Sequence, residues 1–93
     1  MRPDYADAHY NFGIALSQAG RLDEAIAHWQ KTLSIQPGDL EAHVTLGDAL
    51  VKKGQFDEAL AQYETALELA QARGNDALAA KLQDKIDQYR PAR

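Results

Sequence analysis

A unit of 34 residues that occurs twice constrains the fold of this chain more than any other feature. The stretch "GRLDEAIAHW" at residues 20–29 recurs as "GQFDEALAQY" at residues 54–63, and residues 6–39 align with residues 40–73 without a gap. The matching positions include apolar residues three and four apart, which is the spacing of one helix face. A repeat of this length indicates small helical units that stack to bury a shared core.

Each repeat is predicted to form two helices. The first helix ends at Gly20 in repeat one and at Gly54 in repeat two, and its apolar stripe comprises Phe12, Ala15, Leu16 and Ala19, then Leu46, Ala49 and Leu50. The second helix is expected to face inward through Leu22, Ala25, Ile26, Trp29, Leu33 and Ile35, then through Phe56, Ala59, Leu60, Tyr63, Ala66 and Leu67. Pro37 and Gly38 end this helix in repeat one, whereas in repeat two it continues to about Gly74.

A fifth helix is expected at about residues 75–90. Asn75 or Asp76 can cap its N-terminus, Pro91 marks its end, and its apolar edge comprises Leu78, Leu82, Ile86 and Tyr89. The predicted fold class is therefore all-α, a five-helix solenoid of helix-turn-helix repeats. The length of 93 residues suits one domain over residues 1–93, with repeat one at 6–39, repeat two at 40–73 and the closing helix after them.

The repeat resembles the tetratricopeptide repeat, a 34-residue unit with Leu-Gly in its first helix, Ala-x-x-x-Phe in its second and a proline at its end. The positions that carry the resemblance are Phe12-Gly13 and Leu46-Gly47, Ala25 with Trp29, Ala59 with Tyr63, and Pro37. The chain departs from the family pattern where His9 and His43 replace tryptophan, Leu16 and Leu50 replace tyrosine, and Gln71 replaces a second proline. The resemblance covers about residues 3–73, and residues 75–90 resemble the helix that usually closes such arrays.

Two glycines inside helices support this fold on physical grounds. Gly13 and Gly47 occupy positions where glycine costs about 1 kcal/mol relative to alanine. We expect a neighbouring helix to approach each of them too closely for a β-carbon, with Ala25 and Ala59 as the small residues of the partner helix.

Two carboxylate pairs, Asp23-Glu24 and Asp57-Glu58, raise the question of acid-base or cation chemistry. Adjacent residues on a helix point about 100° apart, so neither pair converges on one point. Both pairs begin a predicted second helix, where carboxylates cap free amides and complement the helix dipole. Capping is therefore the preferred interpretation.

The three histidines are His9, His28 and His43. His9 and His43 share one repeat position, which places them on adjacent parallel helices about 10 Å apart, too far for one metal ion. We interpret all three as structural or surface residues, with metal binding and pH sensing as the alternatives.

No catalytic residue, metal or cofactor is expected. The serines and threonines lack a glycine-framed elbow, the glycines form no phosphate loop, and the absence of cysteine excludes disulfides and thiolate zinc sites. Trp29 and Tyr63 could form a ligand-stacking pair, but core packing is the preferred interpretation because both lie on the interior stripe.

The resemblance implies a protein-interaction scaffold whose first helices line a concave groove for a peptide or partner helix. The matching positions in this chain are Asp7, Tyr10, Asn11, Ile14, Ser17, Glu41, Val44, Thr45, Asp48, Val51 and Lys52, to which Leu78 or Lys81 could be added. Its apolar line is flanked by carboxylates, which favours a partner segment that is apolar with basic character. The alternative is that the chain serves only as a spacer in a longer array and that its groove residues bind no partner.

One version of this groove in the family clamps the C-terminal carboxylate of chaperones with lysine and asparagine. Tyr10, Ile14 and Thr45 stand at those positions here, so chaperone binding is not expected. The net charge of −4 argues against RNA and against anionic membranes as partners. The chain has no signal peptide pattern and no apolar run of membrane-spanning length, so it is expected to be soluble and, by default, cytoplasmic.

Self-assembly is the competing function. Pro3 stands 34 residues before Pro37, where an earlier repeat would end, so the chain is expected to derive from a longer array. The first helix should then leave one apolar flank uncovered, and such a flank favours stacking on another copy or exchange of helices.

Overall fold

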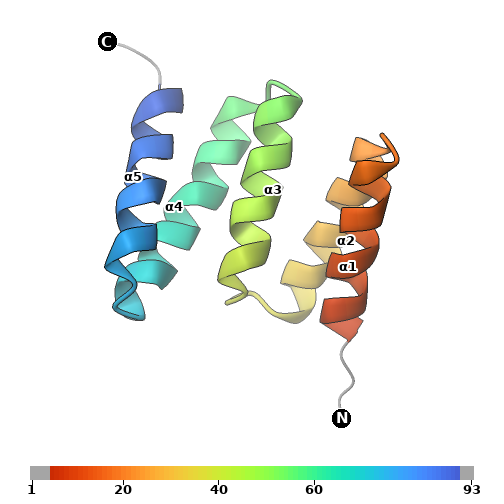
Figure 1. Cartoon of the computed structure of the whole chain (residues 1–93), viewed down its shortest axis with the longest axis horizontal. Coiled ribbons are helices and arrows are strands. Elements are labelled where there is room, and N and C mark those ends of the chain that lie inside the picture. The colour runs from red at the N-terminus through yellow and green to blue at the C-terminus, as the bar shows by residue number, and fades with distance from the viewer. Residues whose placement is uncertain (1–4, 91–93) are drawn as a thin grey trace.

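Five helices form the part of the chain that the computed structural model describes, residues 5–90 (Figure 1). Their bounds are Tyr5–Gln18 for α1, Leu22–Ile35 for α2, Leu40–Lys52 for α3, Phe56–Ala72 for α4 and Asp76–Tyr89 for α5. No strand occurs within these residues, which confirms the all-α, five-helix prediction. The expectations for Pro3 and Pro91 fall outside the described residues.

The helices follow one another side by side, and each packs mainly against its neighbours in the chain (Figure 1). α1 pairs with α2 and α3 pairs with α4, while α2 contacts α3 and α5 covers α4. The resulting body measures 42 × 30 × 18 Å. Its core is therefore a continuous layer between successive helices, as expected for a solenoid.

The first helix of each repeat ends at a glycine, as predicted. Gly20 and Gly54 have φ angles of 82° and 76°, a left-handed conformation that residues with a β-carbon rarely adopt. The chain then turns back so that the Arg21 amide donates to the Leu16 carbonyl at 2.8 Å.

The Asp-Glu pairs do not cap the second helices through side-chain hydrogen bonds, so this part of the prediction is wrong. Arg21 and Gln55 occupy the N-cap positions of α2 and α4, and neither makes a side-chain cap. The carboxylates lie within the first turn, where they still complement the helix dipole. Asp23 instead pairs with Lys53, and Glu24 accepts from Arg21.

The other two helix starts do have side-chain caps. Asp39 accepts from the Ala42 amide at 3.1 Å at the start of α3. Asn75 accepts from the Leu78 amide at 3.2 Å at the start of α5, which confirms one of the two predicted caps there.

The two interior glycines mark the closest helix contacts, as predicted. A β-carbon on Gly13 would lie 2.5 Å from Nε1 of Trp29, and one on Gly47 would lie 2.6 Å from Cε1 of Tyr63. Trp29 and Tyr63 are only 2% and 1% exposed, so core packing accounts for both rings.

Repeat-equivalent residues of α1 and α3 differ sharply in burial. Phe12 is 52% exposed, whereas Leu46, at the same repeat position, is 1% exposed. Exposed apolar residues at helical spacing on α1 and in the turn after it form a stripe, which we name the α1 flank and which consists of Ala8, Phe12, Ala15 and Ala19. The uncovered flank is therefore confirmed within the described residues.

Several residues predicted to face inward are exposed. Phe12, Ala15 and Ala19 are exposed because α1 lacks the second neighbour that α3 has in α2. Ile35 and Phe56, both 44% exposed, lie at the ends of α2 and α4, and the Tyr89 ring of α5 covers only part of Phe56.

Candidate binding surface

Residues of α1 and α3 that were predicted to bind a partner meet directly in the structure. The Tyr10 hydroxyl lies 3.0 Å from Oγ1 of Thr45, a hydrogen bond that joins the two helices. The half-buried members of the predicted set are Tyr10, Ile14, Ser17, Val44, Thr45, Asp48 and Val51, and the exposed members are Asp7, Asn11, Glu41 and Lys52. We name this set the α1–α3 face.

Carboxylates surround the Tyr10 end of the α1–α3 face. The pKa of Tyr10 is raised above its usual value mainly by burial, and the negative charges of Glu41 and Asp39 raise it further. The hydrogen bond with Thr45 acts in the opposite direction. The Tyr10 hydroxyl therefore lies near the negative charges of Glu41 and Asp39.

Asp48 is engaged by two side chains from other helices. It accepts a hydrogen bond of 2.5 Å from the Tyr63 hydroxyl, and Nζ of Lys85 lies 3.2 Å from the same oxygen. Lys85 also lies over the Tyr63 ring, 5.6 Å from its centroid. Asp48 is thus an internally paired carboxylate, whereas Asp7 and Glu41 form no ion pair within residues 5–90.

Sequence reasoning named Leu78 or Lys81 as the contribution of α5 and missed Lys85. Lys85 belongs to a helix that has no repeat copy, and repeat one carries Ile14 where repeat two carries Asp48. No spacing rule therefore linked Lys85 to Asp48 before the packing of α5 was known.

Ionisation of Tyr63 is expected to make folding sensitive to alkaline pH. Burial, followed by the hydrogen bond and charge of Asp48, raises the pKa of Tyr63 well above its usual value of about 10. Above about pH 10 the Tyr63 hydroxyl loses its proton in the unfolded chain but keeps it in the folded chain. The free energy of unfolding should therefore fall by up to about 1.4 kcal/mol per pH unit.

Urea unfolding of the native chain and of Tyr63→Phe between pH 8 and 11 measures this effect. At pH 8 the variant should be less stable by about 1 kcal/mol, because it lacks one hydrogen bond. The difference should shrink and reverse as the pH rises past 10. Parallel losses of stability in the two proteins would contradict the assignment.

The histidines make contacts that sequence reasoning did not foresee. Nδ1 of His9 lies 3.0 Å from Nδ1 of His28, and Nδ1 of His43 lies 2.7 Å from Oε1 of Gln62. Both contacts join residues 19 apart, so they are repeat copies of one another. Nε2 of His43 also donates to the Pro37 carbonyl at 2.7 Å. The two repeat-equivalent contacts tie the first helix of each repeat to its second helix, and the Pro37 contact ties α3 to the turn before it, so these are structural roles.

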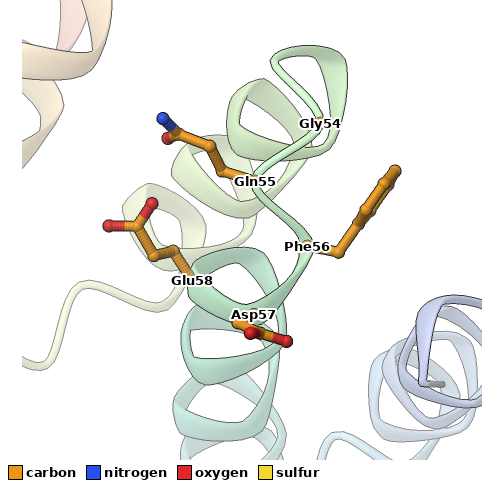
Figure 2. Close-up of a pocket in the computed structure, with 5 residues that line it drawn as sticks. All are labelled: Gly54, Gln55, Phe56, Asp57 and Glu58. Carbon is orange, nitrogen blue, oxygen red and sulfur yellow. The ribbon is translucent and has the colours of Figure 1, made fainter.

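A hollow of about 400 Å³ lies at the turn between α3 and α4, lined by Gly54, Gln55, Phe56, Asp57 and Glu58. Figure 2 shows that Gln55 and Glu58 point to one side of this turn while Phe56 points to the other. The side chains do not converge on one point, and all five residues are exposed, so the hollow lacks the form of a substrate site. Residues 5–90 also contain no group of three or more side chains positioned to hold a metal ion.

Comparison with known proteins agrees with this all-helical architecture. A family model described as tetratricopeptide repeat matches residues 16–86. The chain belongs to the tetratricopeptide repeat family. No curated protein matched the sequence.

Solved structures resemble the chain at two levels of sequence identity. A crystal structure of MamA is 38% identical with a TM-score of 0.73, over 76% of this chain and 42% of that chain. The solution structure of a tetratricopeptide repeat domain protein from Salinibacter ruber has a TM-score of 0.85 at 18% identity, over 97% of this chain and 91% of that one. The chain thus spans about two fifths of MamA, and the second likeness concerns the fold alone.

Tetratricopeptide repeat domains are protein–protein interaction modules, and the family is generally non-catalytic. None of the five helices is long and apolar enough to span a membrane.

Proposed function

We propose that the α1–α3 face binds an extended segment of a partner protein, and that this segment is apolar with basic character. The observation that carries the proposal is the hydrogen bond between Tyr10 and Thr45, which joins two helices into one surface near the carboxylates of Glu41 and Asp39. Tyr10, Ile14, Val44 and Val51 are half-buried, so a partner can remove their remaining apolar area from water.

The charges around this face favour a basic partner at the Tyr10 end. Asp7 and Glu41 are exposed, whereas the charge of Asp48 is offset by Lys85. A lysine or arginine of the partner would therefore be attracted to Tyr10 and Glu41 rather than to Asp48. A free carboxylate would meet the same negative field, which disfavours the chaperone type of clamp.

Titration with short peptides tests the proposal. A basic, apolar peptide should bind the native chain, and an acidic peptide of the same length should bind at least ten times more weakly. Glu41→Lys should weaken binding of the basic peptide several-fold, because it replaces a negative charge near Tyr10 with a positive one. The double variant Tyr10→Ala with Ile14→Ala should weaken this binding further, because it removes apolar area from the α1–α3 face. Ala27→Asp, an exposed change on α2, is the matched control.

Two results would end this proposal. One is that neither peptide binds at millimolar concentration. The other is that the Tyr10 and Ile14 double variant binds as tightly as the native chain while circular dichroism shows both to be folded.

Self-association through the α1 flank is the second candidate function. Phe12 is 52% exposed among the exposed alanines of the α1 flank, and an exposed apolar flank of a repeat helix favours stacking on another surface. Sedimentation over a concentration series should detect association, and a strict monomer at 1 mM would exclude it.

A further inference from the structure

The α1 flank repeats the surface by which α3 packs on α2. Ala8 and Ala15 match Ala42 and Ala49, which are 0% and 4% exposed in α3. Both helices contact the second helix of their own repeat, and only α3 contacts the second helix of the repeat before it. The contact with α2 therefore explains the burial of these alanines in α3, and by repeat symmetry the α1 flank is shaped for a surface like that of α2.

α4 carries a copy of that surface. We name it the α4 stripe, and it comprises Phe56, Leu60, Tyr63 and Leu67, which match Leu22, Ile26, Trp29 and Leu33 of α2. Leu33 of α2 lines one hollow together with Leu46 of α3, which places this side of α2 against α3. Leu67 is its repeat equivalent in α4.

α5 packs on the α4 stripe within the chain, although Phe56 of the stripe remains 44% exposed. The Tyr89 ring lies 5.7 Å from the Phe56 ring and 6.5 Å from the Tyr63 ring, measured between centroids. Leu82 and Ile86 of α5 are 0% and 1% exposed, and α4 is the helix against which α5 chiefly packs. In Figure 1, α5 lies at the opposite end of the row of helices from α1.

We propose that the α1 flank of one copy docks on the α4 stripe of a second copy, in the place that α5 occupies in its own chain. This inference rests on the second candidate function and names the surface that receives the flank. α5 is then an internal competitor that occupies the α4 stripe. Because the contact joins two different surfaces, it is heterologous and can extend from copy to copy.

Other surfaces of a second copy fit the flank less well. The outer side of α5 carries exposed charges at Asp76, Lys81, Asp84 and Asp87. Two α1 flanks facing one another would offer only two phenylalanine rings among alanines. The α4 stripe alone has the repeat register in which α3 already docks on α2.

Covalent attachment gives α5 a large advantage over a second copy. A helix joined by a short turn competes at an effective concentration of about 1 mM. With equal intrinsic affinity, a second copy at about 10 µM would therefore be disfavoured about 100-fold. The native chain should associate only at high concentration, and weakening α5 should bring association to lower concentration.

Sedimentation velocity on the full chain from 10 µM to 1 mM tests the inference. Tyr89→Ala removes the ring contacts between α5 and the α4 stripe and should lower the concentration for half association at least tenfold. Asn75→Ala removes the cap of α5 without altering the stripe and should lower it at least threefold. Adding Phe12→Asp to either variant should restore the monomer, whereas adding Ala27→Asp should not.

Mixing two variants tests the head-to-tail geometry. Tyr89→Ala with Phe12→Asp offers an open α4 stripe but no flank, and the native chain offers a flank but a covered stripe. Each should be monomeric at 50 µM, and the mixture should form a heterodimer. Absence of that heterodimer, with both proteins folded by circular dichroism, would overturn the inference.

The outcomes separate the two proposals. If Phe12→Asp leaves the association of the native chain unchanged, the second candidate function is wrong. If Phe12→Asp abolishes association while neither Tyr89→Ala nor Asn75→Ala strengthens it, that function stands and the α4 stripe is not the docking surface. If these variants strengthen association that Phe12→Asp leaves intact, α4 stripes pair with each other and the inference fails.

Discussion

Replacing Leu46 with alanine is expected to lower the free energy of unfolding by about 2–5 kcal/mol, while the equivalent change at Phe12 should cost less than about 1 kcal/mol. The two residues share one repeat position, but Leu46 is 1% exposed and Phe12 is 52% exposed. Truncation at Leu46 leaves a cavity between α2, α3 and α4. Truncation at Phe12 loses mainly its edge contact with the His28 ring, whose centroid lies 4.7 Å away.

Urea denaturation of both variants under identical conditions measures this difference. For a domain with a total stability of about 5–15 kcal/mol, the Leu46 variant should unfold at a visibly lower urea concentration. Equal losses at the two positions would mean that the α1 flank is covered in solution, which the association experiments would then explain.

Gly47→Ala is expected to destabilise the chain by about 1–3 kcal/mol, although alanine is the better helix former by about 1 kcal/mol. The new β-carbon would lie 2.6 Å from Cε1 and 2.9 Å from Cδ1 of Tyr63. The ring cannot easily retreat, because it is 1% exposed and its hydroxyl donates to Asp48. Overpacking should therefore outweigh the gain in helix propensity.

A second background isolates the steric cause. In Tyr63→Ala, which is itself less stable, the added methyl group of Gly47→Ala meets no ring and should raise stability by up to about 1 kcal/mol. Gly38→Ala is the control, since its β-carbon would meet only Arg73 at 3.6 Å, an ordinary contact. Gly47→Ala raising stability in both backgrounds would contradict the close-approach explanation.

Much of the fold was predictable because the same local sequence signals occur in both repeats. The glycine ends, the apolar stripes and the small residues at 13, 25, 47 and 59 all act within one or two helices, so their spacing carries the information. The capping of α2 and α4 was predicted wrongly, because a carboxylate near a helix start has other partners available. Lys53, from the end of α3, pairs with Asp23 across 30 residues.

The candidate binding surface was predictable only in part. Positions in α1 and α3 followed from the repeat, and the structure joins two of them through Tyr10 and Thr45. The charge of this surface could not be predicted from the repeat, because Asp48 is paired with Lys85. Lys85 lies 37 residues away, in a helix without a repeat copy. The contact between His9 and His28 was also missed, since alignment at 34 residues compares His9 with His43 instead.

The sequence by itself determined five helices, their ends and the register in which they repeat, because propensity, glycine conformation and apolar spacing are local properties. The tertiary structure alone decided which copy of each repeated residue is buried. Phe12 and Leu46 are equivalent in sequence, and only the presence of α2 beside α3 separates a surface residue from a core residue. Burial in a solenoid depends on the neighbouring repeat. An apolar residue at the end of the described array can therefore be exposed, although its equivalent in the next repeat is buried.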